Sequence, residues 1–85
     1  MISYMQRLQK GGVRSFSEAI TLESLREKAK PITKLSDSAG VTKAAMTGTV
    51  DRLERRGLVQ RRPNEFDRRG VVVALTQKGE SLLNG

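Results

Sequence analysis

The spacing of apolar residues predicts one amphipathic helix near the centre of the chain, over residues 42–56. Its apolar positions recur at i, i+4 and i+7 and so share one narrow helical face: Met46, Val50 and Leu53. Thr42 carries a side-chain oxygen that suits a helix start, and Gly57 suits the left-handed residue that ends one. We therefore expect this helix to bury one stripe and to expose the opposite face.

Two shorter helices are expected before it. Ser15 stands three residues before Glu18, the spacing of a capping box. Helical spacing continues through Ala19, Leu22, Leu25 and Ala29 and predicts a helix over about 15–28. Pro31 ends this helix, and either a short extended segment over residues 31–33 or a helix that begins at Pro31 follows. The second helix runs to about Ala39, and Gly40 then begins a three-residue turn into the helix 42–56. A helix, a tight glycine turn and a second helix form a helix-turn-helix.

The first fourteen residues are weakly patterned. Ile2, Met5 and Leu8 fit one or two helical turns, which Gly11 and Gly12 interrupt. Two interpretations remain open: a partly frayed turn, or a helix that packs on a partner chain.

After Gly57 the apolar period changes to two, which predicts strands over residues 58–62 and 71–75. The segment 63–70 between them is polar and too long for a tight hairpin, so we expect a projecting loop, or wing, whose base Phe66 packs. Thr76 suits the cap of a last helix over residues 77–84, with Leu82 and Leu83 facing inward.

The expected fold class is α+β and mainly α: a winged helix-turn-helix of three helices, a β-hairpin wing over about 58–76 and a short C-terminal helix. Residues 1–14 form an N-terminal tail or short helix, and residues 15–85 form the winged-helix domain.

The charge and composition of the chain limit the classes of partner that it could bind. The chain has 85 residues and a formal net charge of +7, and seven arginines fall within residues 52–69, which favours a polyanionic partner. Without cysteine or histidine, we expect no metal, no cofactor and no disulfide. No apolar run approaches the roughly 18 residues of a membrane span, and no signal-peptide pattern opens the chain, so we expect a cytoplasmic location and no membrane partner.

The exposed face of helix 42–56 carries mostly small side chains at its start and arginines at its end. We expect it to enter the major groove of double-stranded DNA and to read base edges through Lys43, Ala44, Thr47 and Gly48. Gly48 costs about 1 kcal/mol of helix propensity relative to alanine, which favours close approach of the backbone to DNA. We expect phosphate contacts from among Arg52, Arg55, Arg61 and Arg62. The alternative is that these residues are simply a solvated helix face.

Three motifs carry a resemblance to a known family. Residues 35–42 resemble the helix-turn-helix entry of the multiple-antibiotic-resistance regulators, the MarR family, and Thr47 with residues 50–59 resemble its recognition helix. The wing pattern D-x-R-x-x-x-V-x-L-T-x-x-G is the most specific match, filled by Asp67, Arg69, Val73, Leu75, Thr76 and Gly79. The resemblance covers about residues 20–83.

The resemblance implies a regulator of transcription that binds double-stranded DNA at pseudo-palindromic operators. In the family, the wing arginine reaches the minor groove and the aspartate two residues earlier holds it in place. These roles fall to Arg69 and Asp67, with Arg68 beside them in the wing, residues 63–70. Family members are usually longer and dimerise through terminal helices. We therefore expect a monomer, or a weak homodimer through residues 1–10 and 77–84, and no small-molecule effector.

Two other function classes can be compared with sequence-specific DNA binding. A winged helix that mediates protein contact or assembly on DNA would show little sequence selectivity. An enzyme would have Glu65 and Asp67 as its acidic pair, but they lie on an exposed loop among arginines. We therefore expect no enzymatic activity.

Overall fold

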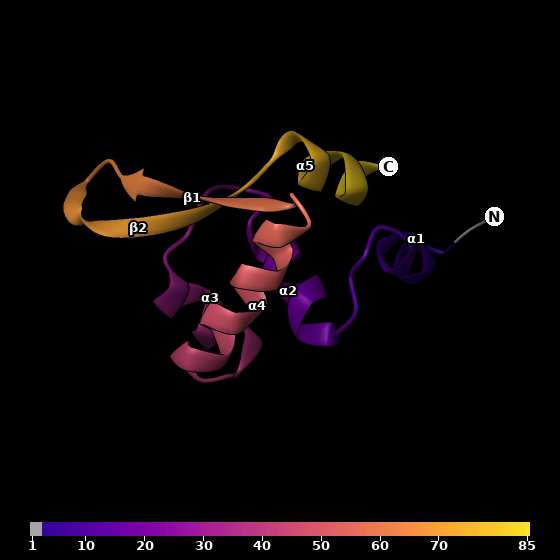
Figure 1. The fold of residues 1–85 in the computed structure, drawn as a ribbon, viewed down its shortest axis with the longest axis horizontal. Coiled ribbons are helices and arrows are strands. Elements are labelled where there is room, and N and C mark those ends of the chain that lie inside the picture. The colour runs from indigo at the N-terminus through magenta and orange to yellow at the C-terminus, as the bar shows by residue number, and fades with distance from the viewer. Residues whose placement is uncertain (1–2) are drawn as a thin grey trace.

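A helix-turn-helix and a β-hairpin share one apolar core in the computed structural model, which describes residues 3–85 (Figure 1). The elements in chain order are α1 (Tyr4–Lys10), α2 (Phe16–Ser24), α3 (Ile32–Ala39), α4 (Lys43–Arg55), β1 (Val59–Asn64), β2 (Asp67–Leu75) and α5 (Gln77–Asn84). The hairpin extends away from the helices as a wing. This is the mainly α winged helix-turn-helix that the sequence predicts. No helix within residues 3–85 is long and apolar enough to cross a membrane.

The central helix forms as predicted. The hydroxyl oxygen of Thr42 accepts a hydrogen bond from the backbone N–H of Ala45 at 3.0 Å, which caps the start of α4. Gly57 follows its end with φ +77°, a conformation that favours glycine. The predicted stripe is buried against the other helices: Met46, Val50 and Leu53.

The turn between α3 and α4 also follows the prediction. Gly40 has φ +67°, and its backbone N–H donates to the carbonyl of Asp37. Neither alternative for Pro31 is fully correct. Pro31 has an extended backbone and is the N-cap, so it is not the first helical residue, but Ile32 and Thr33 already belong to α3.

The helix expected over residues 15–28 is shorter in the structure, where α2 ends at Ser24. The N–H groups of Leu25 and Arg26 each bond to a carbonyl three residues back, which tightens and ends the helix. The chain then turns so that Lys30 pairs with Val73 through two backbone hydrogen bonds of 3.0 and 2.8 Å. This long-range pairing with β2 fixes the position of the chain before α3.

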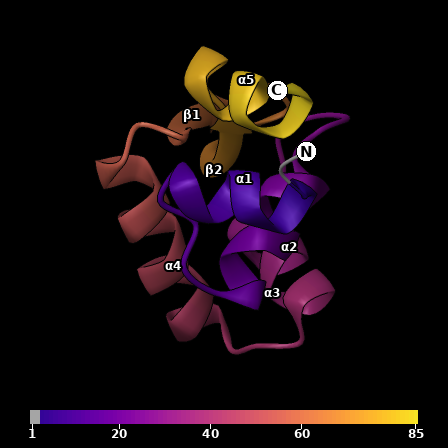
Figure 2. The same cartoon turned by 90° about the vertical axis from the view of Figure 1, so that its right-hand side faces the viewer.

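The first helix packs on its own chain. The side chain of Leu8 is fully buried in the core, and Arg7 donates to the carbonyls of Leu82 and Leu83 at 3.1 and 2.9 Å. Figure 2 shows α1 beside α5. α1 is thus an ordered helix and not a frayed turn, and Leu8 and Leu83 are buried and so unavailable for a contact patch. Ile2, the first residue of the predicted stripe, lies outside the residues that the structure describes.

The wing is a tight hairpin, so the long loop expected over residues 63–70 is wrong. The strands pair from Val59 with Leu75 to Asn64 with Asp67, and the turn contains two residues. The Asn64 side chain accepts from the Phe66 N–H at 2.9 Å, which favours the turn. An irregularity at Pro63 and Asn64 accommodates the extra residues of β2. The turn also holds Phe66 at the tip, where it is 96% exposed, so the expectation that Phe66 packs the base of the wing is wrong as well.

Candidate nucleic-acid interface

The N-terminal half of α4 exposes a face that consists mostly of small side chains. Lys43, Ala44 and Thr47 are exposed, and Gly48 is half-buried. The Thr47 hydroxyl donates to the carbonyl of Lys43 at 3.0 Å, so its oxygen stays free to accept a bond from outside. A Cβ added at Gly48 would meet, as its nearest atom, Arg52 Nη1 at 3.6 Å, which is ordinary contact. Packing within the molecule therefore leaves room for a side chain at Gly48.

The wing exposes the four predicted contact residues Arg62, Asp67, Arg68 and Arg69. The Asp67 carboxylate accepts a hydrogen bond from the backbone N–H of Arg69 at 3.0 Å. Among the ion pairs of residues 3–85, none joins Asp67 to an arginine. Asp67 therefore holds the backbone that carries Arg69, and the guanidinium projects freely from it.

Arg61 joins the recognition helix to the wing. It pairs with Asp51 at 2.7 Å and with Glu54, both on α4. Its hydrogen bond to Asp51 is the main cause that raises the pKa of the Arg61 guanidinium. Because two carboxylates compensate its charge, Arg61 is a structural link between α4 and β1 and a weaker candidate for phosphate contact than the sequence suggested.

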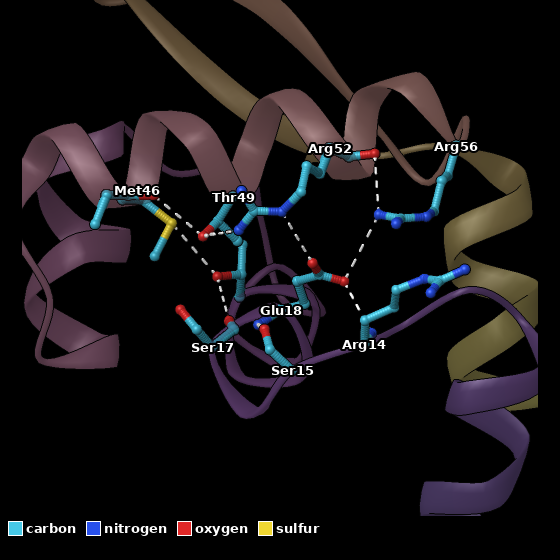
Figure 3. Close-up of polar contacts among 10 residues, drawn as sticks. Arg14, Ser15, Ser17, Glu18, Met46, Thr49, Arg52 and Arg56 are labelled. Carbon is cyan, nitrogen blue, oxygen red and sulfur yellow. Dashed lines mark hydrogen bonds and ion pairs between the residues drawn. The ribbon is translucent and has the colours of Figure 1, made fainter.

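Arg52 also has a partner inside the protein. Its Nε atom lies 3.2 Å from a carboxylate oxygen of Glu18, which is 2% exposed. As the capping-box spacing predicts, Ser15 accepts from the N–H of Glu18 at 3.1 Å. The Glu18 carboxylate, however, accepts from the N–H of Arg14 and reaches toward α4, where Figure 3 shows it between Arg52 and Arg56. The reciprocal half of the capping box is therefore absent from this cap.

Arg55 has no such partner. It is exposed on α4, and none of the ion pairs within residues 3–85 includes it. Together with Arg52 and Arg56 it lines a cavity of about 330 Å³ at the basic end of the helix. The three arginines offer a concentrated positive surface there.

A second basic surface lies between α3 and the wing and was missed in the sequence. A groove of about 660 Å³ runs there, and four cations line it: Lys28, Lys30, Lys34 and Arg62. Apolar side chains from both sides, including Pro31 and Val72, share the lining. The three lysines precede the wing by about thirty residues, and no periodic pattern links them to it, so only the folded chain reveals the groove.

Comparison with known proteins identifies the family. The profile of the MarR family matches residues 20–71. The chain belongs to the MarR family. It is 34% identical over 95 residues to the uncharacterized HTH-type transcriptional regulator YfiV of Bacillus subtilis, covering 99% of this chain and 59% of that protein. It is 37% identical over 68 residues to the transcriptional repressor MprA of Escherichia coli K12, covering 80% of this chain and 39% of that protein.

Solved structures of MarR-type proteins show the same fold. The regulator BldR from Sulfolobus solfataricus superposes with a TM-score of 0.81 at 34% identity, over 95% of this chain and 58% of that one. A mutant MarR from E. coli, complexed with operator DNA, superposes with a TM-score of 0.80 at 29% identity, again over 95% and 58%. The chain thus spans less than two thirds of the length of these relatives. They are named as transcriptional regulators, which agrees with the prediction that the chain is not an enzyme.

Proposed function

We propose that this chain binds double-stranded DNA sequence-specifically, as the DNA-binding part of a MarR-type transcriptional regulator. The observation that carries the proposal is the pairing of an exposed, slim α4 face with a projecting wing whose tip region carries Arg68 and Arg69. A helix fits the major groove of DNA, and an arginine on a narrow hairpin fits the minor groove. The net charge of +7 supports a polyanionic partner.

In this arrangement the start of α4 reads base edges. The Lys43 ammonium suits the two acceptors of guanine, and the free Thr47 oxygen suits the amino groups of adenine or cytosine. The Ala44 methyl suits the methyl group of thymine, and Gly48 lets the helix backbone approach the base pairs closely.

The basic side chains of α4 and of the wing contact DNA phosphates on both sides of α4. Arg52 and Arg55 lie toward the end of the helix, and Arg62 and Arg68 lie on the wing. The strand of DNA backbone between the major and minor grooves passes between the helix-turn-helix and the wing, and the groove between α3 and the wing, lined by Lys30, Lys34 and Arg62, offers it a cationic track. Arg69 enters the minor groove from a backbone that Asp67 holds.

Selection from a randomised duplex pool tests the proposal. We expect enrichment of one short motif, the half-site, and affinity for it that falls steeply with salt, by about 0.9 in log–log slope for each phosphate contacted. Thr47→Ala should change the enriched bases, with Thr47→Ser as the control that keeps the hydroxyl. Arg69→Ala should weaken binding to most sequences, most strongly where the flanking minor groove is narrow. Affinity that does not respond to salt would overturn the proposal.

A second candidate function is assembly on DNA through protein contacts, with little sequence specificity. Two exposed apolar residues on the wing favour it: Phe66, and Val71, which is half-exposed. The same selection separates the candidates, because a pool without enrichment, combined with salt-dependent binding, supports the assembly role.

A further inference from the structure

A buried carboxylate connects α2 to the recognition helix. Glu18 is 2% exposed, and one of its oxygens accepts from the N–H of Arg14 at 3.0 Å and lies 3.8 Å from Arg56 Nη1. The other oxygen lies 3.2 Å from Arg52 Nε. Burying a carboxylate is costly unless its oxygens are paired. Here both oxygens are paired, one facing Arg52 of α4 and the other facing Arg56, the C-cap of that helix.

The same contacts fix the Arg52 side chain. Its Nε atom donates to Glu18, and its Nη2 atom donates to the hydroxyl of Thr49 at 3.2 Å. Thr49 is buried and is itself held, because its hydroxyl donates to the carbonyl of Ala45 at 3.2 Å. A guanidinium is planar, so two fixed nitrogens determine the direction of the third.

The third nitrogen points along the candidate DNA face. Arg52 Nη1 lies 3.6 Å from the position of a Cβ built at Gly48, a residue of the candidate DNA face. The Arg52 side chain is 46% exposed although its Nε and Nη2 are occupied. Figure 3 shows the guanidinium over Glu18 and beside Thr49. One edge of the group is therefore held by the protein and the other is presented to solvent.

We propose that Glu18 is a positioning residue that pre-orients Arg52 for contact with a backbone phosphate of DNA, an inference that rests on the proposed function. A free arginine loses its rotamer freedom when it binds, and a side chain already held in its bound direction loses less. A guanidinium can bond a carboxylate with one edge and a phosphate with another, which an ammonium does with poorer geometry.

Arg55 provides a matched control. It lies three residues after Arg52 on the same helix, is exposed, and takes part in none of the ion pairs of residues 3–85. Both arginines contribute one charge to the same end of α4. They differ in whether a buried carboxylate orients them.

The first experiment compares Arg52→Lys with Arg55→Lys on the duplex that the wild-type chain selects. Both variants keep the charge. We expect Arg52→Lys to weaken binding by about tenfold, because the lysine loses the two-edged geometry. Arg55→Lys should weaken binding less than Arg52→Lys does, because a lysine keeps the charge and no buried carboxylate orients the side chain at this position. Equal effects of the two substitutions would overturn the proposal.

The second experiment is a double-mutant cycle with Glu18→Gln and Arg52→Ala, measured as DNA affinity, with circular dichroism and thermal unfolding as controls of folding. If Glu18 acts through Arg52, Glu18→Gln alone weakens binding by about tenfold and adds little in the Arg52→Ala background. Additive losses would show that Glu18 acts through the fold and would overturn the proposal. A gain of affinity from Glu18→Gln would overturn it too, because Glu18 would then withhold Arg52 from DNA. If Glu18→Gln fails to fold, the lysine comparison still decides.

The two proposals fail in different ways. If the wild-type chain binds none of the duplexes, the proposed function is wrong, and this inference is wrong with it. If it binds DNA and the cycle shows no coupling between Glu18 and Arg52, the inference alone is wrong.

Discussion

Two carboxylates contact the basic surface in different ways. The Asp67 carboxylate accepts from the backbone N–H of Arg69, so it sets the shape of the wing. The Glu18 carboxylate reaches the guanidinium of Arg52, so it sets the direction of a side chain. Each carboxylate lowers the net positive charge near the surface by one unit. Each therefore favours DNA binding only if the order that it imposes on an arginine outweighs the lost attraction to DNA.

Substitutions of Asp67 can separate the effect of its hydrogen bond to the Arg69 backbone from the effect of its negative charge. Asp67→Ala and Asp67→Asn both raise the net charge by one, but asparagine keeps an oxygen that can accept from the Arg69 N–H. We expect Asp67→Ala to weaken DNA binding several-fold, on the order of 1 kcal/mol for a lost hydrogen bond. Asp67→Asn should bind at least as well as the wild-type chain. Fluorescence anisotropy with the selected duplex measures both. Stronger binding by Asp67→Ala on every sequence would mean that charge alone matters.

At the scale of elements, local signals were sufficient where a helix end depends on its own residues. The caps at Thr42, Gly40 and Thr76 formed as the sequence predicts, because each needs one hydroxyl or one glycine at a helix boundary. The end of α2 and the tight wing turn do not follow from the sequence pattern. They depend on the pairing of Lys30 with Val73 and on the Asn64 side chain, and neither has a periodic signature.

The candidate interface also has features that the sequence predicts and features that only the fold reveals. The exposed positions of α4 follow from helical spacing, because the apolar stripe fixes the opposite face. The lysine-lined groove and the pairing of Glu18 with Arg52 join residues that lie more than twenty positions apart. The spacing of Ser15 and Glu18 predicts a helix cap, which forms, but it contains no signal for the pairing of the Glu18 carboxylate with Arg52.

Gly48 allows a prediction about α4 as an element. Its backbone is helical and a Cβ would have room, so Gly48→Ala should raise the free energy of unfolding by up to about 1 kcal/mol. The same methyl group should weaken DNA binding if the helix backbone approaches the bases. Urea unfolding and anisotropy measure the two effects. Gly57→Ala is the control: at φ +77° it should destabilise the chain. A Gly48→Ala variant that is more stable and binds DNA normally would rule out close approach.

The contact between α1 and α2 should respond to acid. Glu23 bonds to Arg26 and to the Tyr4 hydroxyl, and these two bonds, the arginine first, lower the pKa of its carboxyl below the ordinary value of 4.5. A lowered folded-state pKa adds stability above pH 4.5 that disappears as pH falls through the folded pKa. The group is nearly half exposed, so solvent screening keeps the effect small. Thermal unfolding should show Glu23→Gln less stable than wild type at pH 7, with a difference that shrinks as pH falls below 4.5. A difference that stays constant as the pH is lowered would assign the effect to packing.

For the whole molecule, the packing of the termini limits self-association. α1 and α5 cover each other within one chain, and their central leucines, Leu8 and Leu83, are buried. Tyr4 and Leu82 are partly buried against the same core, and Met5 is about half exposed. Within residues 3–85, the apolar surface that remains at this end of the chain is therefore smaller than the sequence pattern suggests.

We accordingly predict that this 85-residue chain is a monomer at micromolar concentration and pairs when two copies occupy adjacent half-sites. An obligate dimer usually buries more than roughly 2,000 Å² in total. Within residues 3–85, the half-exposed Met5 and the edges of α1 and α5 do not provide this area. Sedimentation velocity without DNA, and again with a duplex that carries two half-sites, tests this. Met5→Glu should leave the first measurement unchanged and should weaken pairing on DNA only if this end of the chain forms the contact. A dimer that persists on dilution without DNA would require an opening of the contact between α1 and α5, because the closed form buries the leucines that such an interface needs.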